Sequence, residues 1–343
     1  MGRILNSLGF ALAAYQPHIT GERKIKSLTK LVLIGQDQKG QKVIIKTSRA
    51  AIEKKKISLE RKIRQELEQL SQTVKDLLIP KEVYFGSKKG FLFFITEFVD
   101  QPKVFVAHSL KEQFEMIKKA VESQEAVNRQ SFHMITGNGS VCPIFTEKEY
   151  WNELKRQIDF INKNYSNLGL RQTLAAAQKI FREKMPLIAK YCGYLIHEDF
   201  CPHNFRVNNG QLHFLDYTAA NFGNKYITWA RLLNYMTLHN PKLEKKILRD
   251  FKKNRNQEDL ECLRILRIYK TVFLIMYYAK ISKKTSGKLL ALTKVRIDFW
   301  HNFLQKLLQN KTLAQSELDR YLQKRDSLRS AEEKKRQKEF AIA

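Results

Sequence analysis

Hydrophobic positions follow two different spacings along the chain. In the first hundred residues, short apolar runs over residues 28–34, 42–45, 83–85 and 91–95 are separated by turn-forming residues such as Gly, Asp and Gln. Short runs bounded in this way predict pairs of antiparallel strands. A longer segment, residues 50–73, instead repeats its apolar residues every three or four positions, which predicts a helix. We therefore expect a small sheet accompanied by one long helix.

Beyond Gln101 and Pro102, where the last strand is expected to stop, the apolar spacing becomes helical almost throughout. Helices are expected over residues 110–126, 147–164, 172–192 and 224–238, in several pieces over 241–310, and as a long polar helix over 311–340. The pattern predicts an α+β protein in three parts: a sheet-containing part over 1–100, a helical part over 101–310, and a basic C-terminal helix or tail over 311–343.

Residues 195–217, LIHEDFCPHNFRVNNGQLHFLDY, interrupt the helical pattern. Two short strand-like runs in this segment flank an Asn-Asn-Gly sequence, which is a strong signal for a tight turn. The resulting hairpin would return Asp216 to the neighbourhood of Asp199 and Asn204. Three oxygen-bearing side chains in one place are what Mg²⁺ and a phosphate chain require.

The order of residues in this segment resembles that of the aminoglycoside phosphotransferase and choline kinase family. The shared features are H-x-D-x-x-x-x-N from His197 to Asn204, a Pro two residues before that Asn, a hairpin, and then Asp216 within Leu-Asp-Tyr. The run V-I-I-K ending at Lys46 also matches the strand-borne lysine of kinases. The resemblance implies a two-lobed protein-kinase-like fold with a small, mainly antiparallel β N-lobe and a large helical C-lobe. It also implies ATP-dependent, Mg²⁺-assisted transfer of a phosphoryl group to a hydroxyl of a small molecule.

On this resemblance, Asp199 is the expected catalytic base and His197 orders its loop, while Asn204 and Asp216 are the expected Mg²⁺ ligands. A base positioned against a hydroxyl contributes roughly 10²–10⁴-fold to such a reaction. Taken singly, these residues are equally compatible with a buried His and Asp on an ordinary loop. The joint spacing favours the kinase-like interpretation.

Lys46 is expected to hold the α and β phosphates of ATP, and it needs a glutamate partner from the long helix. Glu60 lies on the apolar face of that helix, at helical spacing from Ile63, where a buried lysine partner is reasonable. Glu66 instead has the usual family spacing to the proline of the next strand. We favour Glu60 and keep Glu66 as the alternative.

Two further contacts to ATP follow from the resemblance. Residues 21–27 occupy the position of the loop that covers the phosphates in kinases, although they contain only one Gly. Ser27 is the candidate phosphate ligand in this loop, and a plain β-turn is the alternative. Glu97 and Val99 mark the segment that would link the two lobes and bind adenine through its backbone.

The sequence departs from the family pattern at three places. Glu198 stands where Gly is usual, Thr218 stands where some members have a second acid, and Thr228 begins a segment that lacks an expected structural Asp. These departures leave a nucleotide-binding pseudokinase open as an alternative. A protein kinase also stays open, although the chain has neither D-F-G nor A-P-E.

The chain of 343 residues carries a net charge of +28, from 62 Lys and Arg against 34 Asp and Glu. Such a field attracts nucleotides, nucleic acid and other anionic surfaces, and it repels cationic substrates such as an aminoglycoside. A third alternative is therefore a basic binder of nucleic acid or an anionic surface on a kinase-like scaffold. Charge spread evenly over solvated faces is the simpler explanation.

The four cysteines are scattered and form no disulfide framework, so we expect a cytoplasmic protein. Cys192, His197, Cys201 and His203 lie close in sequence, but their spacing matches none of the usual zinc patterns, and no zinc site is expected. Residues 4–19 are expected to open the sheet rather than to act as a signal peptide, because polar residues and Gly interrupt their apolar run. No transmembrane segment is expected.

Overall fold

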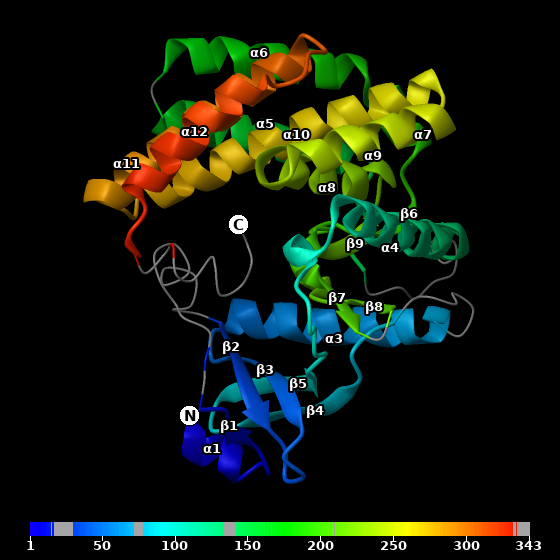
Figure 1. The fold of residues 1–343 in the computed structure, drawn as a ribbon, viewed down its shortest axis with the longest axis vertical. Coiled ribbons are helices and arrows are strands. Elements are labelled where there is room, and N and C mark those ends of the chain that lie inside the picture. The colour runs from blue at the N-terminus through cyan, green and yellow to red at the C-terminus, as the bar shows by residue number, and fades with distance from the viewer. Residues whose placement is uncertain are drawn as a thin grey trace.

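The computed structural model describes residues 1–14, 16, 30–71, 78–132, 142–165, 167–208, 210–331 and 334. The chain forms two lobes, with a small sheet at the N-terminal end and a larger helical lobe (Figure 1). This confirms the predicted two-lobed α+β kinase-like fold. Strand β5 (Phe91–Glu97) is the last strand of this sheet along the chain, and a 3-10 turn at Phe105–Ala107 leads into the helical lobe.

The N-terminal sheet contains five antiparallel strands in the order β1-β2-β3-β5-β4. Besides β5, these are β1 (Ala11–Leu12), β2 (Leu31–Gln36), β3 (Lys42–Ser48) and β4 (Glu82–Lys88). Both strand pairs expected from the apolar pattern are therefore present. The register places Lys46 of β3 between Val32 of β2 and Phe94 of β5.

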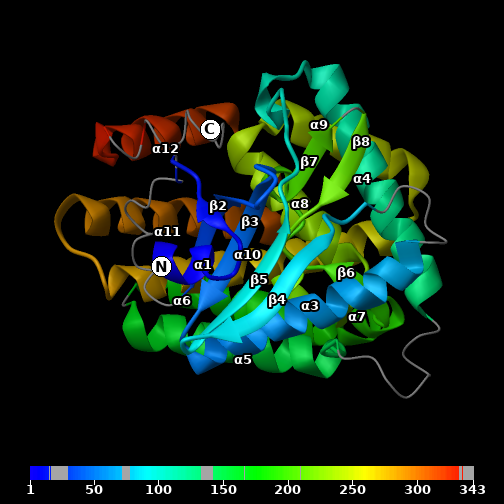
Figure 2. The same ribbon diagram turned by 90° about the horizontal axis from the view of Figure 1, so that it is seen from below.

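The two faces of the sheet pack against different helices, which decides where Lys46 points. Val43 and Ile45 pack with Leu5 of α1 (Gly2–Asn6) on one face. On the other face, Phe94 packs with Ile57 of the long helix α3 (Ala51–Ser71). Because side chains alternate along a strand, Lys46 lies on the α3 face, beside its cross-strand neighbour Phe94. Figure 2 shows α3 running along the sheet.

The helical lobe encloses one large apolar core, to which α3 also contributes. Its helices are α4 (Leu110–Ser131), α5 (Glu147–Asn164), α6 (Leu168–Glu183), α7 (Met185–Lys190), α8 (Tyr226–His239), α9 (Pro241–Asn254), α10 (Gln257–Ser282), α11 (Gly287–Leu308) and α12 (Gln315–Leu328). The prediction of a single helix over residues 172–192 is wrong, because the helix is interrupted at Lys184, between α6 and α7. Pro186, which has no N–H to continue the first helix, lies in the first turn of the second.

Helix α12 packs on the body of the helical lobe. Leu318 and Tyr321 are buried, and the Tyr321 ring stacks on Phe299 of α11 with 4.1 Å between ring centroids. The continuous polar helix expected over residues 311–340 is therefore wrong: α12 spans only Gln315–Leu328, the backbone is extended at Arg329, and the helix has a buried stripe. Within the described ranges, no helix is both long enough and apolar enough to cross a membrane.

Two small strand pairs lie between the sheet and the helices (Figure 1). Strand β6 (Tyr194–His197) pairs with β9 (Ala220–Gly223). The predicted hairpin is present as β7 (Phe205–Asn208) and β8 (Gln211–Phe214), and Gly210 has the positive φ of 73° that a tight turn favours. Together these pairs frame the loop that carries Asp199 and Asn204.

Candidate active site

His197 joins the loop after β6 to the end of the hairpin. Its Nε2 lies 2.8 Å from the carbonyl oxygen of Leu215, and the N–H of Leu215 donates to the carbonyl oxygen of Asn204 at 2.9 Å. Burial lowers the pKa of His197, so the ring is neutral and its Nε2–H is the donor. These two contacts fix the Asp199 loop against the segment that leads to Asp216.

Asp199 is held by partners on both sides of its carboxylate. Arg231 of α8 donates from Nε to Oδ1 at 2.8 Å, and Asn204 donates from Nδ2 to Oδ2 at 3.1 Å and to the backbone oxygen of Asp199 at 2.7 Å. Burial opposes ionisation, but Arg231 and a contact with His203 outweigh it, so the pKa of Asp199 lies well below its usual range. The Asp199 side chain is 41% exposed, which leaves it open to a bound molecule.

Asp216 has a left-handed backbone with φ 57° and ψ 71°, which is uncommon for a residue other than Gly. This conformation turns its carboxylate toward the N-lobe, where Oδ1 accepts from Lys46 at 3.1 Å and from Thr218 at 2.6 Å. Burial raises the pKa of Asp216, but Lys46, Lys30 and Thr218 together lower it below the usual range. Asp216 is therefore an anion at neutral pH.

Lys46 contacts two carboxylates, Glu60 of α3 beside its own sheet and Asp216 of the helical lobe. Besides Asp216, its Nζ contacts Oε1 of Glu60 at 2.5 Å, and Glu60 is fully buried. Burial lowers the pKa of Lys46, but the two carboxylates more than compensate and raise it. Glu66 lies elsewhere, where its carboxylate accepts a hydrogen bond from the Cys142 thiol at 3.6 Å. Of the two glutamates considered as the partner of Lys46, Glu60 is therefore the one in contact with it.

Two oxygen atoms of this group accept no hydrogen bond from any described residue. They are Oδ2 of Asp216 and Oδ1 of Asn204, whose amide nitrogen already donates to Asp199. A carboxylate oxygen and an amide oxygen are suitable ligands for Mg²⁺, which binds oxygen and keeps several waters. The donor set therefore fits the metal that the fold implies.

The segment after β5 offers backbone groups to a ligand. The backbone N–H of Glu97 donates to Lys81 within the sheet, and the Glu97 carboxylate accepts from the N–H of Lys81. Val99 follows the strand, and neither its N–H nor its carbonyl bonds to another described backbone group. Of the two residues expected to bind adenine, Val99 thus has the uncommitted backbone. Ser27 lies outside the described residues.

Glu198, where the family pattern has Gly, is tied to the helical lobe. Its Oε1 accepts from Lys270 of α10 at 2.6 Å and its Oε2 accepts from Asn221 of β9 at 3.1 Å. Lys270 is buried. Sequence reasoning missed this contact and the contact of Arg231 with Asp199, because Lys270 and Arg231 lie on helices far along the chain from the loop.

The structure is similar to solved structures of small-molecule phosphotransferases. A thermostable mutant of the aminoglycoside phosphotransferase APH(4)-Ia, in a ternary complex with ADP and hygromycin B, matches with a TM-score of 0.62 and 12% identity over 91% of this chain and 98% of that chain. A macrolide 2'-phosphotransferase of type I matches with a TM-score of 0.56 and 11% identity over 86% of this chain and 95% of that chain. The amicoumacin kinase hAmiN, in complex with AMP-PNP, Ca²⁺ and Ami, matches with a TM-score of 0.57 and 11% identity over 91% of this chain and 92% of that chain.

No protein-family model matches the sequence, and no curated protein matches it. At this level of identity, the structural likeness shows a common fold. The chain therefore has the fold of these phosphotransferases over most of its length, as the resemblance of residues 195–217 implied. Whether the chain has the activity depends on the residues of its own site, because a shared fold does not establish a shared function.

Proposed function

We propose that the chain is an ATP-dependent phosphotransferase that transfers the γ-phosphoryl group to a hydroxyl of a small molecule. The observation that carries this proposal is the contact of Lys46 with Asp216, which joins a strand of the N-lobe to the end of the catalytic hairpin. Asp199 and Asn204 adjoin the same hairpin through Leu215. A cation for phosphate, oxygen ligands for metal and a carboxylate for a hydroxyl are the parts this reaction uses.

Lys46 and Glu60 form the phosphate-binding part. The raised pKa of Lys46 keeps its ammonium charged at neutral pH, so it offers donors to the α and β phosphates. The buried carboxylate of Glu60 holds that ammonium in place from the side of α3. Val99 offers its backbone to the adenine ring.

Asp199 acts on the acceptor. Its carboxylate stays ionised at neutral pH and accepts the hydroxyl proton as the new P–O bond forms and the bond from the γ-phosphorus to the bridging oxygen of ATP breaks, which releases ADP. Because its pKa is low, Asp199 contributes mainly by orienting the hydroxyl, and Arg231 holds the carboxylate in the orientation needed. Mg²⁺, held by Asn204 and Asp216, would neutralise charge on the phosphate oxygens.

The acceptor is expected to be a neutral or anionic molecule rather than a polycation. The structurally similar proteins have hygromycin B and amicoumacin bound. Here Arg231 lies directly beside the proposed base, and the chain carries a charge of +28. Both features disfavour an acceptor with several ammonium groups.

The test is phosphoryl transfer from γ-labelled ATP, with Mg²⁺, to a mixed metabolite extract. Wild type is compared with Asp199→Asn and with Asp319→Asn, an exposed carboxylate on α12 that serves as the matched control. We expect label in a small molecule, lost only in Asp199→Asn. Label confined to protein would replace the proposal by a protein kinase. ATP binding without any transfer would replace it by a pseudokinase.

A further inference from the structure

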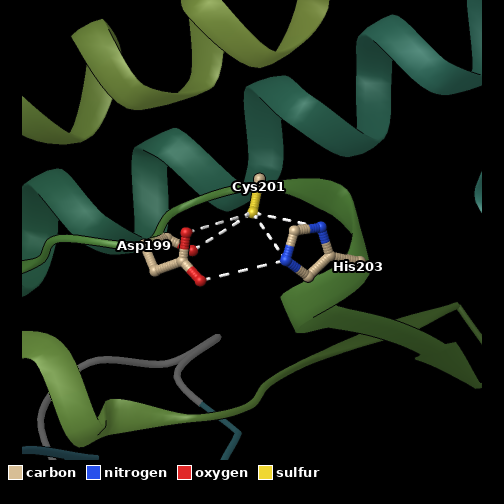
Figure 3. A group of neighbouring side chains, drawn as sticks. All are labelled: Asp199, Cys201 and His203. Carbon is tan, nitrogen blue, oxygen red and sulfur yellow. Dashed lines mark hydrogen bonds and ion pairs between the residues drawn. The ribbon is translucent and has the colours of Figure 1, made fainter. Parts of the chain in front are cut away.

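Asp199, Cys201 and His203, in the loop after β6, each offer one possible metal-binding atom, and these three atoms lie within 4.8 Å of one another (Figure 3). The Cys201 Sγ lies 3.2 Å from His203 Nε2 and 3.7 Å from Asp199 Oδ1. His203 Nε2 lies 3.8 Å from Asp199 Oδ2. The sequence did not predict this group, because D-x-C-x-H is not one of the common zinc spacings. His197, which was considered together with the cysteines, does not belong to the group, because its Nε2 bonds to Leu215.

The separations match those of ligands around one ion. With bonds of about 2.3 Å to sulfur and about 2.0–2.1 Å to nitrogen and oxygen, tetrahedral Zn²⁺ places its ligand atoms roughly 3.3–3.6 Å apart. The distances of 3.2 Å from Sγ to Nε2 and 3.7 Å from Sγ to Oδ1 differ from these by a few tenths of an ångström, and His203 Nε2 lies 3.8 Å from the other carboxylate oxygen, Oδ2. One ligand atom from each residue lies within 4.8 Å of the other two, so side-chain adjustments can bring the three atoms around one ion.

The surroundings suit a site with an open position. The Cys201 side chain is fully buried, whereas the side chains of His203 and Asp199 are 33% and 41% exposed. An ion can thus reach the group from the exposed side and keep a water as its fourth ligand, as in zinc sites with three protein ligands. The 3-10 turn Pro202–Asn204, together with the hydrogen bonds of Asn204 to Asp199, holds the loop in shape.

We propose that Asp199, Cys201 and His203 form a site for a thiophilic divalent cation such as Zn²⁺, and that an ion bound there inhibits phosphoryl transfer. The inhibition, unlike the binding, rests on the proposed function. Binding releases the Cys201 thiol proton to solvent and joins the thiolate, the imidazole and a carboxylate oxygen of Asp199 to the metal. That oxygen then cannot accept the proton of an acceptor hydroxyl.

The ligand types separate this site from the Mg²⁺ site. Thiolate and imidazole favour Zn²⁺ and related ions, whereas Mg²⁺ prefers oxygen donors alone. Asn204 and Asp216 supply only oxygen. Millimolar Mg²⁺ should therefore leave the proposed site available, and a low concentration of Zn²⁺ should occupy it.

Metal binding is measured first, because it does not depend on activity. Co²⁺ is added to the full chain, and the thiolate-to-cobalt charge-transfer band is recorded, with Zn²⁺ as the competitor. We expect one ion per chain and displacement of Co²⁺ by Zn²⁺. Loss of an outer-shell partner weakens metal sites 10–100-fold, so removal of a ligand in Cys201→Ser or His203→Ala should weaken binding by at least about 100-fold. Cys192→Ser is the matched control, because this thiol donates to Ile188 outside the group.

The outcomes are distinct. No charge-transfer band in wild type, or an equal band in Cys201→Ser with an unchanged unfolding transition, overturns the site. Phosphoryl transfer is then assayed at increasing Zn²⁺ with excess Mg²⁺, and each variant is compared with its own metal-free rate. Inhibition that shifts to at least about 100-fold higher Zn²⁺ in Cys201→Ser supports the proposal. Inhibition that is equal in both overturns the inhibitory role. Metal binding without detectable transfer contradicts the proposed function but not the site.

Discussion

Glu60 and Glu66 lie on the same helix, and only Glu60 contacts Lys46, so exchanging each for Gln tests the nucleotide site directly. Glu60→Gln keeps the shape of the side chain and removes its charge. Lys46 then retains Asp216 as its remaining carboxylate at 3.1 Å. We expect Glu60→Gln to weaken binding of Mg²⁺-ATP and to destabilise the fold, and Glu66→Gln to do neither to a comparable extent.

The magnitude follows from burial. Breaking a fully buried ion pair costs about 3–5 kcal/mol when the surviving charge has no other partner. Here Lys46 is 13% exposed and keeps Asp216, so the loss is closer to that of one hydrogen bond to a charged group, about 1.5–3 kcal/mol. If the ammonium moves toward Asp216, a similar loss in phosphate binding raises the Kd for Mg²⁺-ATP by at least about 10-fold.

Calorimetric titration with Mg²⁺-ATP measures the first effect, and urea unfolding measures the second. Binding by calorimetry needs no knowledge of the acceptor, so it can be carried out at once. Equal weakening by Glu60→Gln and Glu66→Gln, or no change in Glu60→Gln, would refute the assignment of Glu60 as the residue that orients Lys46.

Three further predictions concern the helical lobe. Arg231→Gln should lower kcat/KM by at least about 10-fold. Because Arg231 lowers the pKa of Asp199, its loss should also move the acid limb of the pH–rate profile to higher pH. An acid limb that does not move would contradict the pairing of Arg231 with Asp199. Lys270→Met leaves Glu198 without its cation and should cost about 1–3 kcal/mol in urea unfolding, with Lys280→Met as an exposed control on the same helix. Tyr321→Ala should cost about 3 kcal/mol by the same measurement, because its ring is buried against α11, and a loss below about 0.5 kcal/mol would show that α12 does not stabilise the lobe.

The fold and the local part of the site were predictable because their signals lie close together in sequence. The Asn-Asn-Gly sequence predicts the turn of the hairpin after Asn204, and the length of the hairpin returns Asp216 to the loop. The apolar face of α3 similarly selected Glu60 over Glu66, because an acid among core positions needs a buried cation.

The contacts that the sequence did not reveal join residues far apart in the chain. Arg231 is 32 residues from Asp199, and Lys270 is 72 residues from Glu198. Each depends on how α8 and α10 pack beneath the loop, which helical periodicity alone does not specify. The break between α6 and α7 was missed for a different reason: apolar spacing continues across Pro186, and periodicity outweighed the proline in the prediction.

Arg231 places a positive charge directly beside the proposed base, in a chain that lacks the structural acid expected near Thr228. Family members usually fix the catalytic loop with an Asp from the region where this chain has Thr228, whereas here Arg231, three residues later, bonds to the base itself. Arg231 thus ties the loop to α8 and places a positive charge beside the Asp199 carboxylate. Under the proposed function, an acceptor that carries ammonium groups would meet this guanidinium as it approaches Asp199. If the proposed function is correct, neutral and anionic hydroxyl compounds are therefore the acceptors that we propose to screen first.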